Sequence, residues 1–125
     1  MIAGVGADIL EVPRIAAGMQ KQRFRERVFT PDELAYCTGK PLESAAGLYA
    51  AKEAAVKAAG VGFTGFWPRD VEITHDALGR PVVRPRGVFK EMCDSRRVII
   101  HVSISHTKDV AIAYAIAECV EEDHR

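Results

Sequence analysis

The run from Ala45 to Gly60 constrains the fold more than any other part of the chain. It consists mostly of alanine with leucine, lysine and glutamate, all strong helix formers, and no proline interrupts it. The sequence therefore predicts a long helix, ending near Gly60, that is slim enough for another backbone or a ligand to come close. Glu53 and Lys57 would lie one turn apart on one face of this helix. On that spacing alone, an ordinary surface ion pair explains the two residues.

The N-terminal residues 2–10 alternate in the manner of a β-strand. Gly4, Gly6 and Asp8 share one face of this predicted strand. Glycine weakens a strand unless something must approach its backbone closely. Two interpretations follow, and both stay open at this point. The glycines clear space around a working carboxylate, or they allow tight helix packing while Asp8 caps the next helix.

A basic segment follows the first strand. Between residues 14 and 27, five basic side chains stand against one acidic side chain, Glu26. Residues 11–20 are predicted to form an amphipathic helix with Pro13 in its first turn. Such a surface suits an acidic helix of another protein or a phosphate ligand, although a solvated helix face would show the same pattern. Nucleic acid is disfavoured as a partner because the chain carries no net charge.

The remaining elements are predicted from caps, alternation and turns. Thr30, Pro31 and Glu33 form a capping box that starts a short helix, and Glu43 or Ser44 would open the long one. After a glycine-rich loop, the pattern predicts a hairpin of two strands, 71–75 and 81–84, and then a helix over residues 87–96. A second pair of strands follows, 98–105 with 110–117.

Two of these later elements carry specific packing expectations. In the helix 87–96, we expect Val88 and Met92 to be buried, with Phe89 beside them. The strand 110–117 carries alanine at every second position, and such a face needs a partner pressed close, for which the alanine-rich helix is the natural candidate. The acidic residues 118–125 are interpreted as a frayed tail.

Length and cysteine usage limit the class of protein. The 125 residues are enough for one domain, residues 1–125, with one modest core. No apolar run is long enough to cross a bilayer, and the first residues lack the basic and apolar parts of a signal peptide. Cys37, Cys93 and Cys119 show no CxxC spacing, so neither a disulfide framework nor a zinc site is indicated. We therefore expect a protein of the reducing cytosol without a membrane segment.

Several blocks of the chain resemble one enzyme family in order and in approximate spacing. The most specific are an early Gly-x-Gly-x-Asp and a later Ala-Ala-Lys-Glu-Ala, and each alone would be weak. The blocks are Gly4-Val-Gly-Ala-Asp-Ile-Leu-Glu-Val-Pro-Arg14, Arg23-Phe…Arg27-Val-Phe-Thr, Ala50-Ala-Lys-Glu-Ala54…Lys57-Ala, Gly79-Arg-Pro-Val and His101-Val-Ser-Ile-Ser-His106. Nearly the whole chain thus resembles holo-acyl-carrier-protein synthase, the small bacterial branch of the phosphopantetheinyl transferases.

The resemblance implies an activity, an assembly and a fold. The family moves the phosphopantetheine arm of coenzyme A onto a serine of apo acyl carrier protein, releases adenosine 3′,5′-bisphosphate and serves fatty acid biosynthesis in the cytoplasm. It uses magnesium and assembles as a homotrimer with active sites between neighbouring subunits. The implied fold is α+β, with a small, mainly antiparallel sheet wrapped around a long helix.

The resemblance also implies roles for particular residues. Magnesium would be held by Asp8 and Glu53, in keeping with its preference for one or two carboxylates plus substrate phosphate oxygens. Lys57 would sit near the pyrophosphate and stabilise its charge, and Glu53 would act through a bound water as general base. His106 and Thr107 match positions that contact the nucleotide end of coenzyme A.

The basic segment matches the region in which the family meets its acidic carrier protein. The implied carrier contacts are Arg14, Lys21, Arg23, Phe24 and Arg27. The chain also departs from the family, because many members have an arginine where this chain has Leu48. If that arginine contacts phosphate, another cation must replace it here, and the candidates are Lys40, Arg84 and Arg86.

Two other classes of function compete with the transferase. A small trimeric binding module would use the basic helix for assembly and would leave Asp8 and Glu53 with structural roles only. A magnesium-dependent nucleotide hydrolase would turn over coenzyme A without any carrier protein. The three hypotheses make different predictions for Glu53→Gln and for the need for a carrier.

Overall fold

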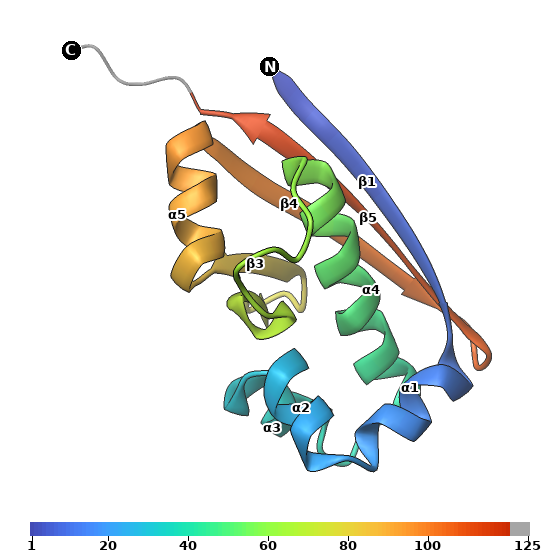
Figure 1. Ribbon diagram of the computed structural model, residues 1–125. Helices are drawn as coiled ribbons and strands as arrows, with labels where there is room; N and C mark the ends of the chain where they lie inside the picture. The colour runs from blue at the N-terminus through green and yellow to red at the C-terminus, as the bar shows by residue number, and fades with distance from the viewer. Residues whose placement is uncertain (121–125) are drawn as a thin grey trace.

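The computed structural model describes residues 1–120 and shows helices packed on one side of an antiparallel sheet (Figure 1). The elements in chain order are β1 (Ile2–Glu11), α1 (Val12–Met19), α2 (Gln22–Val28), α3 (Pro31–Cys37), α4 (Leu42–Ala59), the short 3-10 helix η1 (Pro68–Asp70), β2 (Val71–His75), β3 (Pro81–Pro85), α5 (Gly87–Arg96), β4 (Val98–His106) and β5 (Val110–Cys119). Within the described residues, no helix has the length and apolar character needed to cross a membrane.

The long helix α4 lies across the larger sheet. This sheet has three antiparallel strands in the order β1-β5-β4, and α4 packs against all three (Figure 1). The helix-facing side of β5 is lined by alanines that are at most 2% exposed: Ala111, Ala113, Ala115 and Ala117. The alanines of α4 lie against them in the same core. The predicted pairing of an alanine strand face with the alanine helix is therefore confirmed.

The glycines of β1 allow α4 to approach the strand closely. A Cβ atom at Gly4 would lie 2.2 Å from the carbonyl oxygen of Ala58, and one at Gly6 would lie 2.2 Å from that of Ala54. No side chain fits at either distance, so the glycines serve tight helix packing. Asp8 does not cap α1, because Glu11 occupies that position and no side-chain cap bond is formed.

A few element boundaries and buried faces differ from the sequence expectations. Helix α4 begins at Leu42, one residue before the predicted Glu43, because Pro41 takes the N-cap position. Helix α5 buries Phe89 and Cys93, whereas Val88 is 39% exposed. The reason is that one stripe of positions four residues apart faces the core, and residue 88 lies about 100° away from that stripe. The predicted burial of Val88 is wrong.

Strand β5 is longer than predicted, so the segment predicted as an acidic tail starts within the strand. Strand β5 continues to Cys119 because its alternation persists. The Glu118 carboxylate accepts a hydrogen bond from His101 on the neighbouring strand β4, with 2.8 Å between Oε1 and Nε2. The rest of the predicted tail, residues 121–125, lies outside the described residues.

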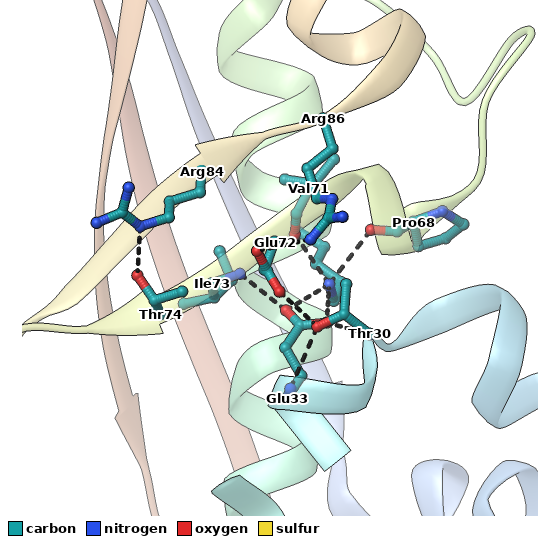
Figure 2. A network of polar contacts seen from close by, with 10 residues as sticks. Thr30, Glu33, Pro68, Val71, Glu72, Ile73, Thr74, Arg84 and Arg86 are labelled. Atoms are coloured by element: carbon teal, nitrogen blue, oxygen red, sulfur yellow. Dashed lines mark hydrogen bonds and ion pairs between the residues drawn. The ribbon is translucent and has the colours of Figure 1, made fainter. Parts of the chain in front are cut away.

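A buried polar network joins α3, α4 and the β2–β3 hairpin (Figure 2). The ammonium group of Lys52 is fully buried and donates to both carboxylate oxygens of Glu33, at 2.8 and 2.7 Å, and to the carbonyls of Pro68 and Val71, at 3.2 and 2.9 Å. Glu33 also completes the predicted capping box at Thr30. The α4 helix is thus fixed to the segment that enters β2.

The opposite side of the three-stranded sheet is apolar and exposed. Side chains of all three strands contribute, and their exposed fractions are Val5 68%, Ile9 68%, Ile99 47%, Tyr114 58% and Ile116 40%. Their strand register places Val5 beside Ile116, and Ala7 beside Tyr114, so the side chains form one continuous surface. Large contiguous apolar surfaces of this kind mark interaction sites.

Candidate functional site

Strand β1 and helix α4 bring three charged side chains together at the edge of the sheet. Lys57 reaches across from α4, and its Nζ donates to the carbonyl oxygen of Ala7 at 2.9 Å and to Oδ1 of Asp8 at 3.4 Å. The Asp8 side chain is 19% exposed and that of Lys57 is 55% exposed. Because Glu53 lies one turn before Lys57, its side chain leaves α4 on the same face.

The electrostatics of Glu53 show that its carboxylate shares a site with Asp8. Burial raises the pKa of Glu53, and the negative charge of Asp8 raises it further, while a hydrogen bond from Tyr49 and the charge of Lys57 oppose the rise. The same two carboxylates raise the pKa of Tyr49 in addition to the effect of its burial. Two acids that are far apart in the sequence are therefore close enough for the charge of Asp8 to act on Glu53, and Lys57 contacts Asp8 beside them.

This arrangement fits a magnesium ion. The charge of Asp8 disfavours ionisation of Glu53, and a divalent cation between them would relieve that repulsion. Among the described residues, no group of three or more His, Cys, Asp or Glu side chains forms a metal cluster, so a fully protein-ligated site is not found there. Magnesium needs only one or two carboxylates when substrate phosphate oxygens and water complete its octahedron.

A cavity of about 540 Å³ opens next to this charged group. It is lined on one side by Tyr49 and Glu53 of α4 and on the other by the loop before β2, through Phe63, Gly65, Phe66, Trp67, Pro68 and Asp70. Its walls are mostly apolar, and the carboxylates of Glu53 and Asp70 are its charged groups. The space can therefore hold a flexible, largely uncharged group beside Glu53.

A second, cationic recess adjoins the first. It has a volume of about 480 Å³ and is lined by Gln22, Arg23, Glu26, Arg27, Trp67 and Arg69. Trp67 lines both recesses, and the guanidinium of Arg27 lies over its indole, 4.5 Å from the ring centroid. The basic surface thus leads directly to the cavity beside Glu53.

The predicted carrier contacts lie on this side of the molecule. The exposed basic residues are Arg14 on α1, Arg23 and Arg27 on α2, and Lys21 in the short link between the two helices. Phe24 is partly buried, and its ring lies 6.1 Å from that of Tyr49, between centroids. The charge of Arg14 lowers the pKa of Tyr49, against the larger effect of burial. The basic helices therefore adjoin the site of Glu53.

His106 and Thr107 lie elsewhere. His106 ends β4, the edge strand opposite β1, and lines a recess of about 230 Å³ with Tyr36, Ser44, Gly47, Leu48, His75, Gly79, Pro81 and Ile104. The Thr107 hydroxyl accepts hydrogen bonds from the backbone N–H groups of Asp109 and Val110, and so stabilises the β4–β5 turn. Within one chain, strand β5 separates these residues from Asp8.

The three cations considered in place of the family arginine have different surroundings. Leu48 is only 2% exposed and lines the recess of His106 with an apolar side chain. Arg86 pairs with Glu72 at 3.3 Å, and Arg84 donates to Thr74 at 3.2 Å. Lys40 alone of the three is close to this recess, because its Nζ lies 4.6 Å from the ring centroid of Tyr36.

Sequence comparison agrees with this geometry. A family model described as the 4′-phosphopantetheinyl transferase superfamily matches residues 4–115. The chain belongs to that superfamily. It is 42% identical over 123 residues to the holo-[acyl-carrier-protein] synthase of Clostridium beijerinckii, with 96% of this chain and 100% of that one covered. It is 47% identical over 122 residues to the corresponding synthase of Clostridium kluyveri, with 94% and 91% covered.

Solved structures of phosphopantetheinyl transferases share the fold. The holo-[acyl-carrier-protein] synthase of Neisseria meningitidis has a TM-score of 0.84 and 35% identity, with 94% of this chain and 99% of that one covered. The synthase of Bacillus anthracis, solved in complex with coenzyme A (3′,5′-ADP), has a TM-score of 0.80 and 34% identity, with 96% and 99% covered. The predicted family, the enzyme class and the α+β fold with antiparallel sheets are confirmed.

Proposed function

We propose that this phosphopantetheinyl transferase moves the phosphopantetheine arm of coenzyme A onto a serine of apo acyl carrier protein and releases adenosine 3′,5′-bisphosphate. The observation that carries the proposal is the meeting of Asp8, Glu53 and Lys57 at one edge of the sheet, beside a cavity and next to a basic surface. This transfer requires carboxylates, a lysine and a surface on which an acidic protein can dock.

The reaction depends on charge and alignment. The serine oxygen attacks the phosphorus that bears the pantetheine arm, the bond from that phosphorus to the bridging oxygen of the pyrophosphate breaks, and the bisphosphate leaves. Asp8 and Glu53 would hold a magnesium ion, which neutralises charge on the phosphate oxygens when bound. Lys57 stabilises the negative charge of the leaving phosphate. Glu53, through a water molecule, accepts the serine proton.

The pH dependence of transfer should report the protonation of Glu53. A base must be deprotonated to act, so a raised pKa places the acidic limb of the rate profile at a higher pH than an ordinary glutamate would. Tyr49→Phe keeps the ring contact with Phe24 and removes the hydrogen bond that lowers the pKa of Glu53. We expect this variant to lose more activity than the unmodified protein as pH falls along the acidic limb of the profile and to match it above that limb. Rate profiles that coincide from pH 5.5 to 8.5 would contradict this role.

The carrier is proposed to dock on the exposed basic residues of α1 and α2. Arg14→Glu should weaken carrier binding by about tenfold at low salt, because the basic surface attracts an acidic partner before contact. The difference in carrier affinity between Arg14→Glu and the unmodified protein should shrink at high salt, because salt shortens the distance over which the charges attract. Binding is measured by titration at two salt concentrations, with Arg96→Glu on α5 as the matched charge reversal. An equal loss for both variants would argue against the α1–α2 surface.

We further propose a homotrimer with active sites between subunits, in the cytoplasm. Two observations support shared sites: the exposed apolar side of the sheet, and the placement of Asp8 and His106 on opposite edge strands. A neighbouring copy would bring its His106 recess toward the Asp8 edge of the first. The free thiols of Cys37, Cys93 and Cys119 suit a reducing compartment.

The activity is tested by intact-mass measurement of an apo acyl carrier protein incubated with coenzyme A, magnesium and the protein. The expected result is a mass gain equal to one phosphopantetheine, with adenosine 3′,5′-bisphosphate released in equal amount. A second reaction, without the carrier protein, tests the hydrolase hypothesis, because a hydrolase would also consume coenzyme A in that reaction. An unchanged carrier mass beside an active reference synthase would overturn the proposal.

A further inference from the structure

The cationic recess beside the cavity of Glu53 is built by two elements that are far apart in the sequence. Helix α2 forms one wall, and η1 with the residue before it forms the other, and the two elements pack against each other. The guanidinium of Arg69 in η1 donates to the carbonyl oxygen of Glu26 in the last turn of α2, at 3.2 Å. The guanidinium of Arg27 lies over the indole of Trp67, 4.5 Å from its centroid. Two arginine contacts therefore join the two walls.

The recess carries an excess of positive charge. Its charged groups are the guanidiniums of Arg23, Arg27 and Arg69 and one carboxylate, that of Glu26. This carboxylate accepts a hydrogen bond from the side-chain amide of Gln22, at 2.9 Å. Within residues 1–120, none of the three arginines forms an ion pair with a carboxylate. An anion that entered the recess would offset the repulsion among the three guanidiniums.

The shape and exposure of the recess indicate what kind of anion fits. A guanidinium presents a planar set of N–H donors that matches both oxygens of a carboxylate. Arg69 uses one of its five N–H donors on the Glu26 carbonyl, so most of the set is left for a ligand. The recess of about 480 Å³ lies at the surface, and all three arginines are exposed. A protein that covers the recess with its own surface excludes water from the contact, whereas a small anion does not.

We propose that this recess is the second wall of the carrier docking site, and that Arg69 and Trp67 hold an acidic side chain of the carrier between η1 and α2. This inference rests on the proposed transferase function. Arg23 and Arg27 belong to the proposed carrier surface, and Trp67 also lines the cavity beside Glu53. A carrier in the recess therefore stays in contact with α2 and lies next to the space in which the arm is transferred. Arg69 and Trp67 stand outside the basic segment from which the sequence predicts carrier contacts.

Fluorescence reports on the recess directly, because Trp67 is the single tryptophan of the chain. Its side chain is 51% exposed in the free protein. An apo carrier that contains no tryptophan is added in the absence of coenzyme A, so that only docking can change the emission. Acrylamide should then quench Trp67 about twofold less efficiently, because the docked carrier excludes water from the indole. Unchanged quenching at a carrier concentration that saturates binding would overturn the inference.

Arg69→Gln should weaken binding of the apo carrier by about tenfold, the effect of one lost hydrogen bond between charged groups. Arg69→Lys keeps the charge without the planar set of donors and should lose less. Arg96→Gln, an exposed change on α5, is the matched control and should bind as the unmodified protein does. In transfer assays the loss should appear as a higher KM for the carrier and not as a lower kcat. Equal carrier affinity of Arg69→Gln and Arg96→Gln would contradict the proposed contact.

A double-mutant cycle identifies the acidic side chain. Each Asp and Glu of the carrier is neutralised in turn and titrated with the unmodified protein and with Arg69→Gln. One carrier acid should show a coupling of at least about fivefold with Arg69, because groups in contact do not act additively. Additive losses for every carrier acid would overturn the inference, although thermal unfolding shows Arg69→Gln to be folded.

Two further results separate this inference from the proposed function. Calorimetric titration with coenzyme A should give the same affinity for Arg69→Gln and for the unmodified protein. A loss as large as that for the carrier would show that the recess holds a phosphate of the nucleotide, and would overturn this inference alone. If the unmodified protein neither binds nor modifies the apo carrier, the transferase proposal fails with it.

Discussion

Asp8→Asn and Glu53→Gln should each reduce phosphopantetheinyl transfer by about 100- to 1,000-fold, the loss that follows when one preorganised charge is removed from a transition state. Both substitutions keep the size and the shape of the side chain and remove its negative charge. Asp8 has its Lys57 contact at 3.4 Å and Glu53 faces the same space, so each loses a magnesium ligand and Glu53→Gln also loses the proposed base. Steady-state rates at saturating coenzyme A and carrier measure the effect.

The fold should survive both substitutions. Neither carboxylate belongs to the buried network around Lys52, and relief of the repulsion between the two acids offsets the weakened contact with Lys57. Circular dichroism and thermal unfolding check this point. Glu91→Gln, an exposed change on α5, serves as the matched control and should leave the rate unchanged. A rate within tenfold of the unmodified protein for either site variant would remove that residue from the mechanism.

Lys52→Met should destabilise the protein by about 3–5 kcal/mol, the cost of leaving a buried charge without its partner. Burial lowers the pKa of Lys52, and the charge of Glu33 opposes that shift, so the ammonium and the carboxylate depend on each other. The substitution leaves the fully buried Glu33 carboxylate with only backbone donors, from Thr30 and Ile73. Urea unfolding measures the loss, which corresponds to a fall in Tm of about 10–20 °C.

A compensated variant separates charge from packing. Glu33→Gln combined with Lys52→Met removes both charges and keeps one acceptor oxygen for the capping N–H of Thr30, while the N–H of Ile73 loses its acceptor. Its stability should recover part of the loss, because the buried charge is gone although one buried N–H group is left without a partner. If the double variant is no more stable than Lys52→Met alone, the buried charge of Glu33 is not the cause.

The features that sequence reasoning predicted correctly depend on local pattern. The capping box at Thr30, the stop at Gly60 and the alternation of β4 and β5 each follow from a few neighbouring residues. The contact between the alanine faces of α4 and β5 also follows, because only small side chains on both surfaces allow it. These elements position Asp8, Glu53 and Lys57, so that group was predictable as a set once the family resemblance was added.

The features that were missed depend on long-range partners. Helical spacing places Lys52 on a different face from Glu53. It does not reveal that the Lys52 ammonium pairs in the core with the carboxylate of Glu33 on another helix. The local pattern predicts Glu33 as a capping residue, and in the structure Glu33 both caps α3 and forms the ion pair with Lys52. The stack of Tyr36 on His75 joins α3 to the end of β2, and no periodicity in either segment signals the contact.

The most direct test of the central claim is a manganese titration followed by electron paramagnetic resonance, with Mn²⁺ as the probe for the magnesium site. In the presence of coenzyme A, the unmodified protein should bind one ion per chain, and Asp8→Asn and Glu53→Gln should each weaken that binding by at least about tenfold, the effect of one lost charge-assisted contact. The Glu91→Gln control should bind as the unmodified protein does. Equal manganese affinity in all four proteins would show that the two acids do not meet around one ion.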